Sequence, residues 1–292
     1  MADIQTIATF PFCREAKIFI EQLKPEVNEY NLELGLRRIE KAIKGKPAQK
    51  VFFDEKYAEE EIISYAFSRL ILAYAQNHYL LSRCAIFEAK QARRNMTMQS
   101  IPYLSAEFGI QGHELKVTSY LMFAPSTPHY MLLNRELSKG VVKINHEEHE
   151  RLIEEAITRR LLSIEKPAEP NKLAQKYASM AISLIPSSPS KIKPSAGMPP
   201  CIKRMIEDAL AHRNLSHTER WVLAAYLIRN GYSNSEISSI FSNLPDYNEK
   251  ITSYHLEHIR KKGYSVPSCD KLKMYGICTE DCKKGYFRGK AK

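Results

Sequence analysis

The sequence predicts a mainly α protein with two helical domains, a small β insert in the first domain and a flexible tether between the two. Three observations predict this. Apolar residues recur at helical spacing through much of residues 1–94 and 200–259. Residues 95–145 instead hold short runs typical of strands, separated by turn residues. Residues 166–197 hold five prolines among serines and lysines, a composition that favours a tether.

The first domain, residues 1–165, is expected to be largely helical. Helices are predicted within Thr6–Ala48, from about Ala58 to Arg94, and over about Glu147–Ile164. Cys13 and Cys84 lie beside apolar residues and are expected to be buried thiols. The apolar stripe of the first segment consists of Leu32, Leu34, Leu36, Ile39 and Ile43.

The insert in this domain is expected to contain three strands. They are predicted over residues 116–123, 130–133 and 141–144, because these runs are rich in β-branched, aromatic and other large apolar residues. Gly140 is the predicted turn before the third strand.

Helix start signals mark the second domain, residues 198–292. Pro199 and Pro200 precede an apolar helical run, and proline suits a first helical turn, whose amides have no partner within the helix. Ser216 and Glu219 form a capping box, which predicts a helix from His217. Two more helices are expected, over 235–243 and 251–259, followed by a loop-like tail.

The net charge of +10 is unevenly distributed along the chain. Residues 1–165 are neutral, residues 166–198 carry +4, and residues 199–292 carry +6. A basic half joined to a neutral half indicates that the second half meets a polyanion such as nucleic acid. The alternative is a basic solvated surface without a specific partner.

Several classes of protein are disfavoured by the sequence. No run of about 18 apolar residues occurs, so no membrane span is expected. The first residues lack the pattern of a secretory signal, so we expect a cytoplasmic protein, in which cysteines are thiols or metal ligands rather than disulfides. No Asp-x-Asp pair or glycine-rich phosphate loop is present, so no catalytic residue is assigned to this chain.

Four of the six cysteines lie in the second domain: Cys201, Cys269, Cys278 and Cys282. The first is 68 positions before the second, and the last three follow the spacing C-x8-C-x3-C. Four thiolates can hold an iron–sulfur cluster or a structural zinc ion. Structural zinc usually draws on closely spaced pairs, and only Cys278–Cys282 has that spacing. Spacing alone predicts metal ligation and leaves the metal open.

Three motifs around these cysteines resemble, in order, the C-terminal domain of the large subunit of archaeal and eukaryotic DNA primases. The first is Met198-Pro199-Pro200-Cys201-Ile202-Lys203, the second is the segment 215–220 (LSHTER), and the third is the segment 264–278 (YSVPSCDKLKMYGIC). The first half resembles the same family more loosely, in its long helices and in the segment 133–142. The resemblance covers nearly the whole chain except the tether.

The resemblance implies one 4Fe–4S cluster, held by the four cysteines, in the helical C-terminal domain. It implies that this domain grips the end of the DNA template and primer together with the initiating nucleoside triphosphate. The first domain would hold the small catalytic subunit, which would carry the nucleotidyl transfer site. In eukaryotic relatives the last cysteine lies much farther downstream than Cys282 does here, so the short spacing fits a minimal archaeal form.

Candidate nucleic-acid residues lie on two predicted helices. His217 and Arg220 match family residues that contact phosphates at the 5′ end of the primer, and helix N-termini favour phosphate. On the second helix Tyr254 and His258 share a face, and Arg260, Lys261 and Lys262 extend that surface. The alternative is an ordinary solvated face on each helix.

Two other functions compete with this hypothesis. One is a zinc-bearing adaptor that binds nucleic acid. The other is a cluster-containing DNA repair glycosylase, which is disfavoured because those enzymes hold their cysteines in one tight motif whereas these span 82 positions. If the primase hypothesis holds, the chain works at the nucleoid.

Overall fold

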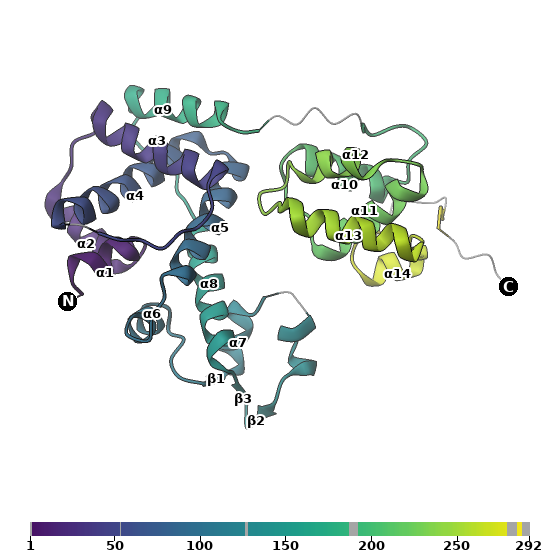
Figure 1. The fold of residues 1–292 in the computed structure, drawn as a ribbon, viewed down its shortest axis with the longest axis horizontal. Coiled ribbons are helices and arrows are strands. Elements are labelled where there is room, and N and C mark those ends of the chain that lie inside the picture. The colour runs from purple at the N-terminus through teal and green to yellow at the C-terminus, as the bar shows by residue number, and fades with distance from the viewer. Residues whose placement is uncertain (1, 53, 126–127, 187–191, 279–284, 288–292) are drawn as a thin grey trace. The chain divides into compact units, whose positions relative to one another are not determined.

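The computed structural model describes residues 2–52, 54–125, 128–186, 192–278 and 285–287. The chain divides into two compact units, Met1–Ile185 and Pro186–Lys292 (Figure 1). The buried apolar residues form separate clusters within each unit. The predicted mainly α class is confirmed. No helix in the described part of the chain has the length and apolar character needed to cross a membrane.

The first unit is a body of helices that carries a small sheet at one end. Asn28, Asp54 and Asn77 cap three of the helices with side-chain oxygens, as expected for these residue types. Its helices are α1 (Ile4–Thr9), α2 (Arg14–Leu23), α3 (Glu29–Lys44), α4 (Glu55–Ala75), α5 (His78–Arg94), α6 (Ser100–Phe108), α7 (Val117–Phe123), α8 (His146–Leu162) and α9 (Lys172–Ser183).

Close packing of α3 on α4 depends on Gly35. A Cβ atom at this position would lie 2.7 Å from the backbone of Phe67 and Ser68, so only glycine allows the two helices to come this close. Leu32, Ile39 and the other buried apolar residues of α3 pack in the same core as Ile71 of α4. Of the predicted stripe, Leu34 is only half-buried; the other four residues are buried.

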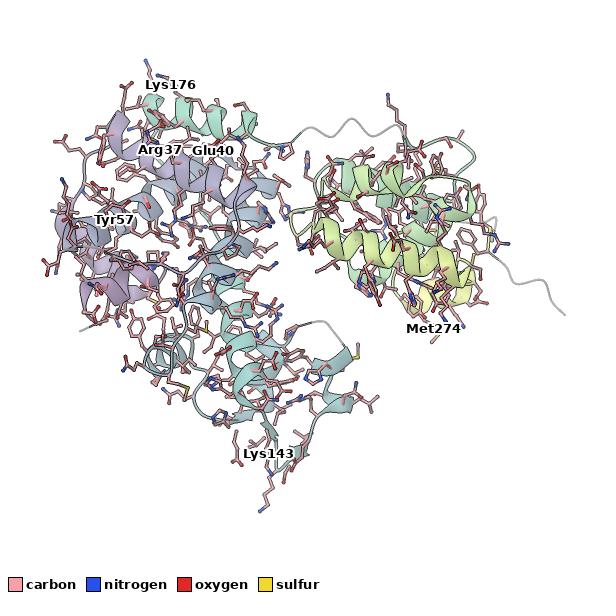
Figure 2. The ribbon with its side chains drawn as sticks, in the orientation of Figure 1. Arg37, Glu40, Tyr57, Lys143, Lys176 and Met274 are labelled. Carbon is pink, nitrogen blue, oxygen red and sulfur yellow. The ribbon has the colours of Figure 1, made fainter. Side chains whose placement is uncertain are left out.

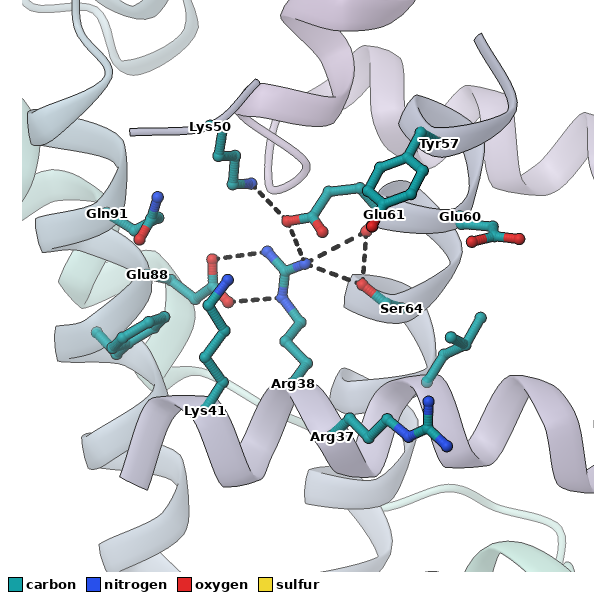
Figure 3. A pocket seen from close by; sticks show the side chains of 12 residues that line it. Arg37, Arg38, Lys41, Lys50, Tyr57, Glu60, Glu61, Ser64, Glu88 and Gln91 are labelled. Atoms are coloured by element: carbon teal, nitrogen blue, oxygen red, sulfur yellow. Dashed lines mark hydrogen bonds and ion pairs between the residues drawn. The ribbon is translucent and has the colours of Figure 1, made fainter. Parts of the chain in front are cut away.

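A buried ion network ties α3, α4 and α5 together (Figure 3). Arg38 of α3 donates to both carboxylate oxygens of Glu88 on α5, at 2.6 and 2.9 Å. Its third nitrogen donates to Glu61 and Ser64 of α4, at 2.8 and 2.9 Å. Lys50, from the segment that follows α3, pairs with Glu61 at 2.8 Å. These interactions satisfy a guanidinium that is only 8% exposed.

Burial and charge act in opposite directions on the carboxyl group of Glu61. Burial alone would raise its pKa, but the charges of Arg38 and Lys50, and their hydrogen bonds, lower the pKa to about 2. Sequence reasoning did not identify this role for Glu61. The partners are distant in sequence, so local pattern gave no signal.

The sheet of the insert is smaller than predicted. Its strands are β1 (Glu114–Lys116), β2 (Leu137–Ser138) and β3 (Val141–Lys143), in the antiparallel order β1-β3-β2. Val142 lies opposite Leu115 on one side and Leu137 on the other, and it is fully buried. The predicted third strand and the turn at Gly140, with φ of +77°, are confirmed.

The predicted strand over 116–123 is wrong, because residues 117–123 form helix α7. Val117, Tyr120, Phe123 and Ala124 contact one apolar core, and their spacing of three and four residues suits a helix. Tyr120 is fully buried, and its hydroxyl donates to the carbonyl of Tyr130 at 2.8 Å. Packing therefore overrides the β propensity of these residues.

The predicted strand over 130–133 is also wrong. Short 3₁₀ turns, η1 (Pro128–Tyr130) and η2 (Leu132–Asn134), occupy this stretch. Both edges of β3 are already paired, with β1 and β2, so β3 has no free edge for another strand. Met131 and Leu133 are exposed as a result, the latter at 94%.

The first unit extends beyond the predicted boundary at residue 165. Helix α9 packs against α3 and α4 through Ala174, Tyr177, Ala178 and Ala181, which belong to the same core as Leu72. The expected tether over 166–197 is thus shorter, because this amphipathic helix finds a partner surface. Residues 187–191 of the tether lie outside the described residues.

The second unit is helical throughout its described elements. Its core gathers Ile202 and Met205, Leu223 and Leu227, and Ile237 and Leu256, among others. The capping box of Ser216 and Glu219 is confirmed, as is the helix start at Pro200. Its helices are α10 (Pro200–Leu210), α11 (His217–Arg229), α12 (Asn234–Phe241), α13 (Glu249–Lys262) and α14 (Cys269–Met274).

We predict that Arg38→Met destabilises the first unit by about 3–5 kcal/mol, because Glu88 would remain buried without its partner. The matched control is Arg37→Met, one residue earlier on the exposed side of α3, whose surface pair with Glu33 contributes less than about 0.5 kcal/mol (Figure 2). Urea unfolding followed by circular dichroism measures the difference. The fluorescence of Trp221, the only tryptophan, reports the second unit and should keep its midpoint. Equal losses in the two variants would contradict the role given to Arg38.

Candidate functional site

The cysteines predicted as metal ligands lie at the two ends of the second unit. Cys201 is the second residue of α10 and is buried in the core. Cys269 is the first residue of α14, so the predicted loop-like tail contains a short helix. Cys278 follows α14 and packs against the same core as Cys201. Cys282 lies outside the described residues.

Hydrogen bonds join α10 to the segment that follows α14, and join Cys269 to Phe287. Arg204, one turn after Cys201, donates to the carbonyl of Ile277 at 3.5 Å, next to Cys278. The amide of Phe287 donates to Sγ of Cys269 at 3.4 Å, and the Cys269 amide donates to the Phe287 carbonyl at 3.2 Å. The start of the unit therefore meets its end.

Tyr226 links the two sides of this region. Its ring meets that of Phe287 edge to face, with centroids 6.1 Å apart. Burial raises the pKa of Tyr226, and the nearby Tyr232 and Cys201 raise it further. Cys201 and Cys269 are thus each close to this pair of rings.

An orphaned donor in the same region fits an anionic metal–thiolate centre. The Nε atom of Arg204 is buried and has no hydrogen-bond partner among the described residues. Thiolate ligands would place negative charge near it. Within the described residues no three His, Cys, Asp or Glu side chains lie close enough to hold a metal ion, and Cys282 is not among those residues.

The remaining cysteines behave as predicted. Cys13 and Cys84 are buried in the first unit, at 1% and 7% exposure. Burial raises the pKa of each thiol to about 12. Both are therefore protonated at neutral pH, as expected for structural thiols.

Three of the predicted nucleic-acid residues of α11 and α13 line a pocket of about 150 Å³, and Tyr254 does not. His217, Arg220 and His258 all contribute to its lining. The imidazoles of His217 and His255 lie edge to face, with centroids 5.7 Å apart. The full lining is His217, Arg220, Trp221, Ala224, Phe241, Ile251, Thr252, His255, Leu256, His258 and Ile259. The lining of the pocket thus combines apolar side chains with imidazole and guanidinium groups.

A row of rings continues from the pocket along α13. Tyr254, 65% exposed, stacks on His258 with centroids 6.3 Å apart and an interplanar angle of 21°. His258 contacts Tyr264, and Tyr264 contacts Trp221, each with centroids 5.9 Å apart. The predicted shared face of Tyr254 and His258 is confirmed. An exposed row of rings can stack on unpaired bases.

Several hydrogen bonds fix the side chain of Arg220 in the lining of the pocket. Its Nε donates to the Leu215 carbonyl at 2.9 Å. Its Nη2 donates to Asn214 at 2.6 Å and to the two carboxylate oxygens of Asp246 at 2.6 and 2.7 Å. The side chain is thus neither freely solvated nor unpaired.

The predicted basic triplet does not line the pocket. Arg260 donates instead to the Tyr232 carbonyl at 2.8 Å and to Asn234 at 3.1 Å, and so braces the start of α12. Lys261 and Lys262 are exposed in the last turn of α13, where cations suit the helix dipole. Lys262 comes four residues after His258 and shares its face.

Sequence reasoning missed three residues of this site. Trp221 and His255 line the pocket, and Asp246 pairs with Arg220. Helical spacing gave a usable signal for His255, which lies three residues before His258. Burial lowers the pKa of His255, and His217 and His258 lower it further, so this imidazole is neutral at neutral pH.

The fold and the site together define a two-unit helical protein whose second unit joins a thiol-rich region to a ring-lined pocket. Residues 191–289 match the family model for the C-terminal domain of the eukaryotic and archaeal DNA primase large subunit. This match confirms the resemblance predicted from the motifs.

Relatives named DNA primase large subunit PriL match this chain, two of them over nearly its whole length and another over about a third of it. The protein of Methanosarcina mazei is 28% identical over 98% of this chain and 88% of its own length. That of Methanococcoides burtonii is 28% identical over 96% of this chain and 89% of its own. The protein of Methanopyrus kandleri is 37% identical over 100 residues, which cover 32% of this chain and 25% of that protein.

Proposed function

We propose that this chain is the regulatory large subunit of a DNA primase and supports RNA primer synthesis by a small catalytic subunit. The observation that carries the proposal is the pocket between α11 and α13, located within the segment that matches the primase family. It would receive the initiating nucleoside triphosphate at the end of the template and primer. Nucleotidyl transfer takes place on the partner in this proposal, at the nucleoid.

Phosphate groups of the nucleotide would lie at the N-terminus of α11. The positive end of the α11 dipole lies there, next to His217 and Arg220, and Ser216 caps the amide of Glu219. The exposed rings of Tyr254 and His258 offer a stacking surface for an unpaired template base. Lys261 and Lys262 add positive charge at the C-terminal end of α13.

Within this proposal Cys201, Cys269, Cys278 and Cys282 hold one 4Fe–4S cluster. The packing of Cys201 and Cys278 on one core and the open donor of Arg204 support this assignment. A bound cluster would join the start of the unit to its end and so add to its folding stability.

We predict that Cys201→Ser, Cys269→Ser and Cys278→Ser each lose iron and lower the unfolding temperature of the second unit. Cys13→Ser and Cys84→Ser are matched controls, because both thiols are buried in the first unit, and they should keep the iron. Iron and acid-labile sulfide are counted per chain after anaerobic purification. Full iron content in any of the first three variants would overturn the ligand set, and zinc in place of iron would favour the adaptor function.

The small catalytic subunit is proposed to dock on the insert of the first unit. Large apolar side chains are exposed there over a short stretch of chain, and exposed apolar groups gathered together mark interaction surfaces. These residues are Leu121, Met122, Met131, Leu133 and Leu137, exposed at 52%, 58%, 54%, 94% and 52%.

Leu133→Asp should weaken binding of the small subunit at least tenfold, because it places a charge in an apolar contact. Met98→Asp is the matched control: Met98 is 75% exposed in the same unit but lies outside residues 121–137. Co-purification and titration calorimetry measure the two affinities. If the two variants bind equally well, the docking surface lies elsewhere.

His217→Ala and Arg220→Ala should impair formation of the first dinucleotide more than extension of a preformed primer. A hydrogen bond to a charged group contributes roughly 1.5–3 kcal/mol, so capture of a 5′-triphosphate by Arg220→Ala should weaken about ten- to a hundredfold. Arg229→Ala, at the other end of α11, is the matched control. Primers with a 5′-hydroxyl provide the second comparison. Equal losses on triphosphate and hydroxyl primers would mean that these residues only support the fold.

A further inference from the structure

The bonding of Arg220 leaves one edge of its guanidinium for a ligand. A guanidinium has five N–H groups. The Nε group and both groups of Nη2 are taken by Leu215, Asn214 and Asp246. Nη1 has no acceptor among the described residues. Arg220 lines the pocket, whereas its three acceptors do not. Nη1 is therefore the donor available to a group that enters the pocket.

Asp246 also cancels the charge of Arg220. The two side chains are 26% and 31% exposed, so solvent screens this pair less than a fully exposed one. Among the described residues that line the pocket, Arg220 is the only arginine or lysine. Burial lowers the pKa of His255, and the neighbouring His217 and His258 lower it further, so His255 adds no charge at neutral pH. The pocket thus offers a fixed guanidinium whose charge is balanced by Asp246.

These features favour selective binding of one phosphate group over the electrostatic attraction that every polyanion shares. A loose, uncompensated arginine contacts any phosphate of a nucleic-acid backbone, and such contacts carry no selectivity. A guanidinium already fixed by three acceptors loses less conformational entropy when it binds a group placed within its reach. Charge compensation by Asp246 removes the part of the attraction that every polyanion shares.

We propose that Asp246 is a specificity-determining residue: it positions Arg220 and cancels its charge, so that the pocket selects a nucleotide 5′-triphosphate over other phosphate groups. This inference rests on the proposed function and deepens it. Asp246 acts through Arg220 and is a positioning residue rather than a direct ligand.

Asp246→Asn tests the proposal in the full chain. Binding of two primer–template duplexes, one with a 5′-triphosphate and one with a 5′-hydroxyl, is measured by fluorescence anisotropy over a series of salt concentrations. The variant should bind the 5′-hydroxyl duplex about two- to fivefold more tightly at low salt, because the charge of Arg220 is no longer balanced. The slope of its log affinity against log salt concentration should steepen by the amount that about one additional phosphate contact would give. The preference for the triphosphate should shrink accordingly.

Two further variants separate charge from position. Glu207→Gln removes one carboxylate from a surface pair with Lys203 on α10 and so makes the same change in net charge. It should leave the preference unchanged. Asn214→Ala removes one acceptor of Arg220 and keeps the balancing charge. It should weaken triphosphate binding without strengthening hydroxyl binding, and it remains a test if Asp246→Asn fails to fold.

The outcomes of these experiments distinguish a failure of this inference from a failure of the proposed function on which it rests. A wild-type chain without a triphosphate preference would overturn both. A wild-type preference that persists unchanged in Asp246→Asn would overturn the inference alone. Equal weakening of both duplexes in Asp246→Asn would also overturn it, because Asp246 would then only support the fold.

Discussion

The junction between the start and the end of the second unit is the constraint on which the candidate site depends. Arg204 on α10 donates a hydrogen bond to the carbonyl of Ile277. The amide of Cys269 donates to the carbonyl of Phe287, and the amide of Phe287 donates to Sγ of Cys269. Helices α11 and α13 pack in the core that this junction encloses. The pocket depends on the spacing of these two helices, so the proposed cluster would act on the pocket by stabilising the unit that carries it.

The first unit achieves its rigidity differently. A buried Arg38, satisfied by Glu88, Glu61 and Ser64, joins three helices, and Gly35 allows two of them to pack closely. This body supports an insert whose apolar side chains face solvent. Each unit has its own core, which fits the proposed division of work between binding a protein partner and binding a nucleotide.

Local signals in the sequence predicted much of the second unit. The capping box at Ser216 and the proline at position 200 located two helix starts, and helical spacing placed Tyr254 and His258 on one face. Residue types in 117–123 favoured a strand, but the segment forms helix α7, which buries Tyr120. No local pattern could reveal Asp246, because it meets Arg220 across 26 residues of chain. Long-range pairs such as this one, and that of Arg38 with Glu88, arise only from the tertiary fold.

Primer synthesis on unprimed single-stranded DNA tests the central claim most directly. The small catalytic subunit is assayed alone, with the full chain, and with a fragment that ends at Ile185, the limit of the first unit. We expect that only the full chain supports formation of the first dinucleotide, while the fragment binds the small subunit and permits extension of a preformed primer. Initiation by the fragment at the level of the full chain would contradict the account.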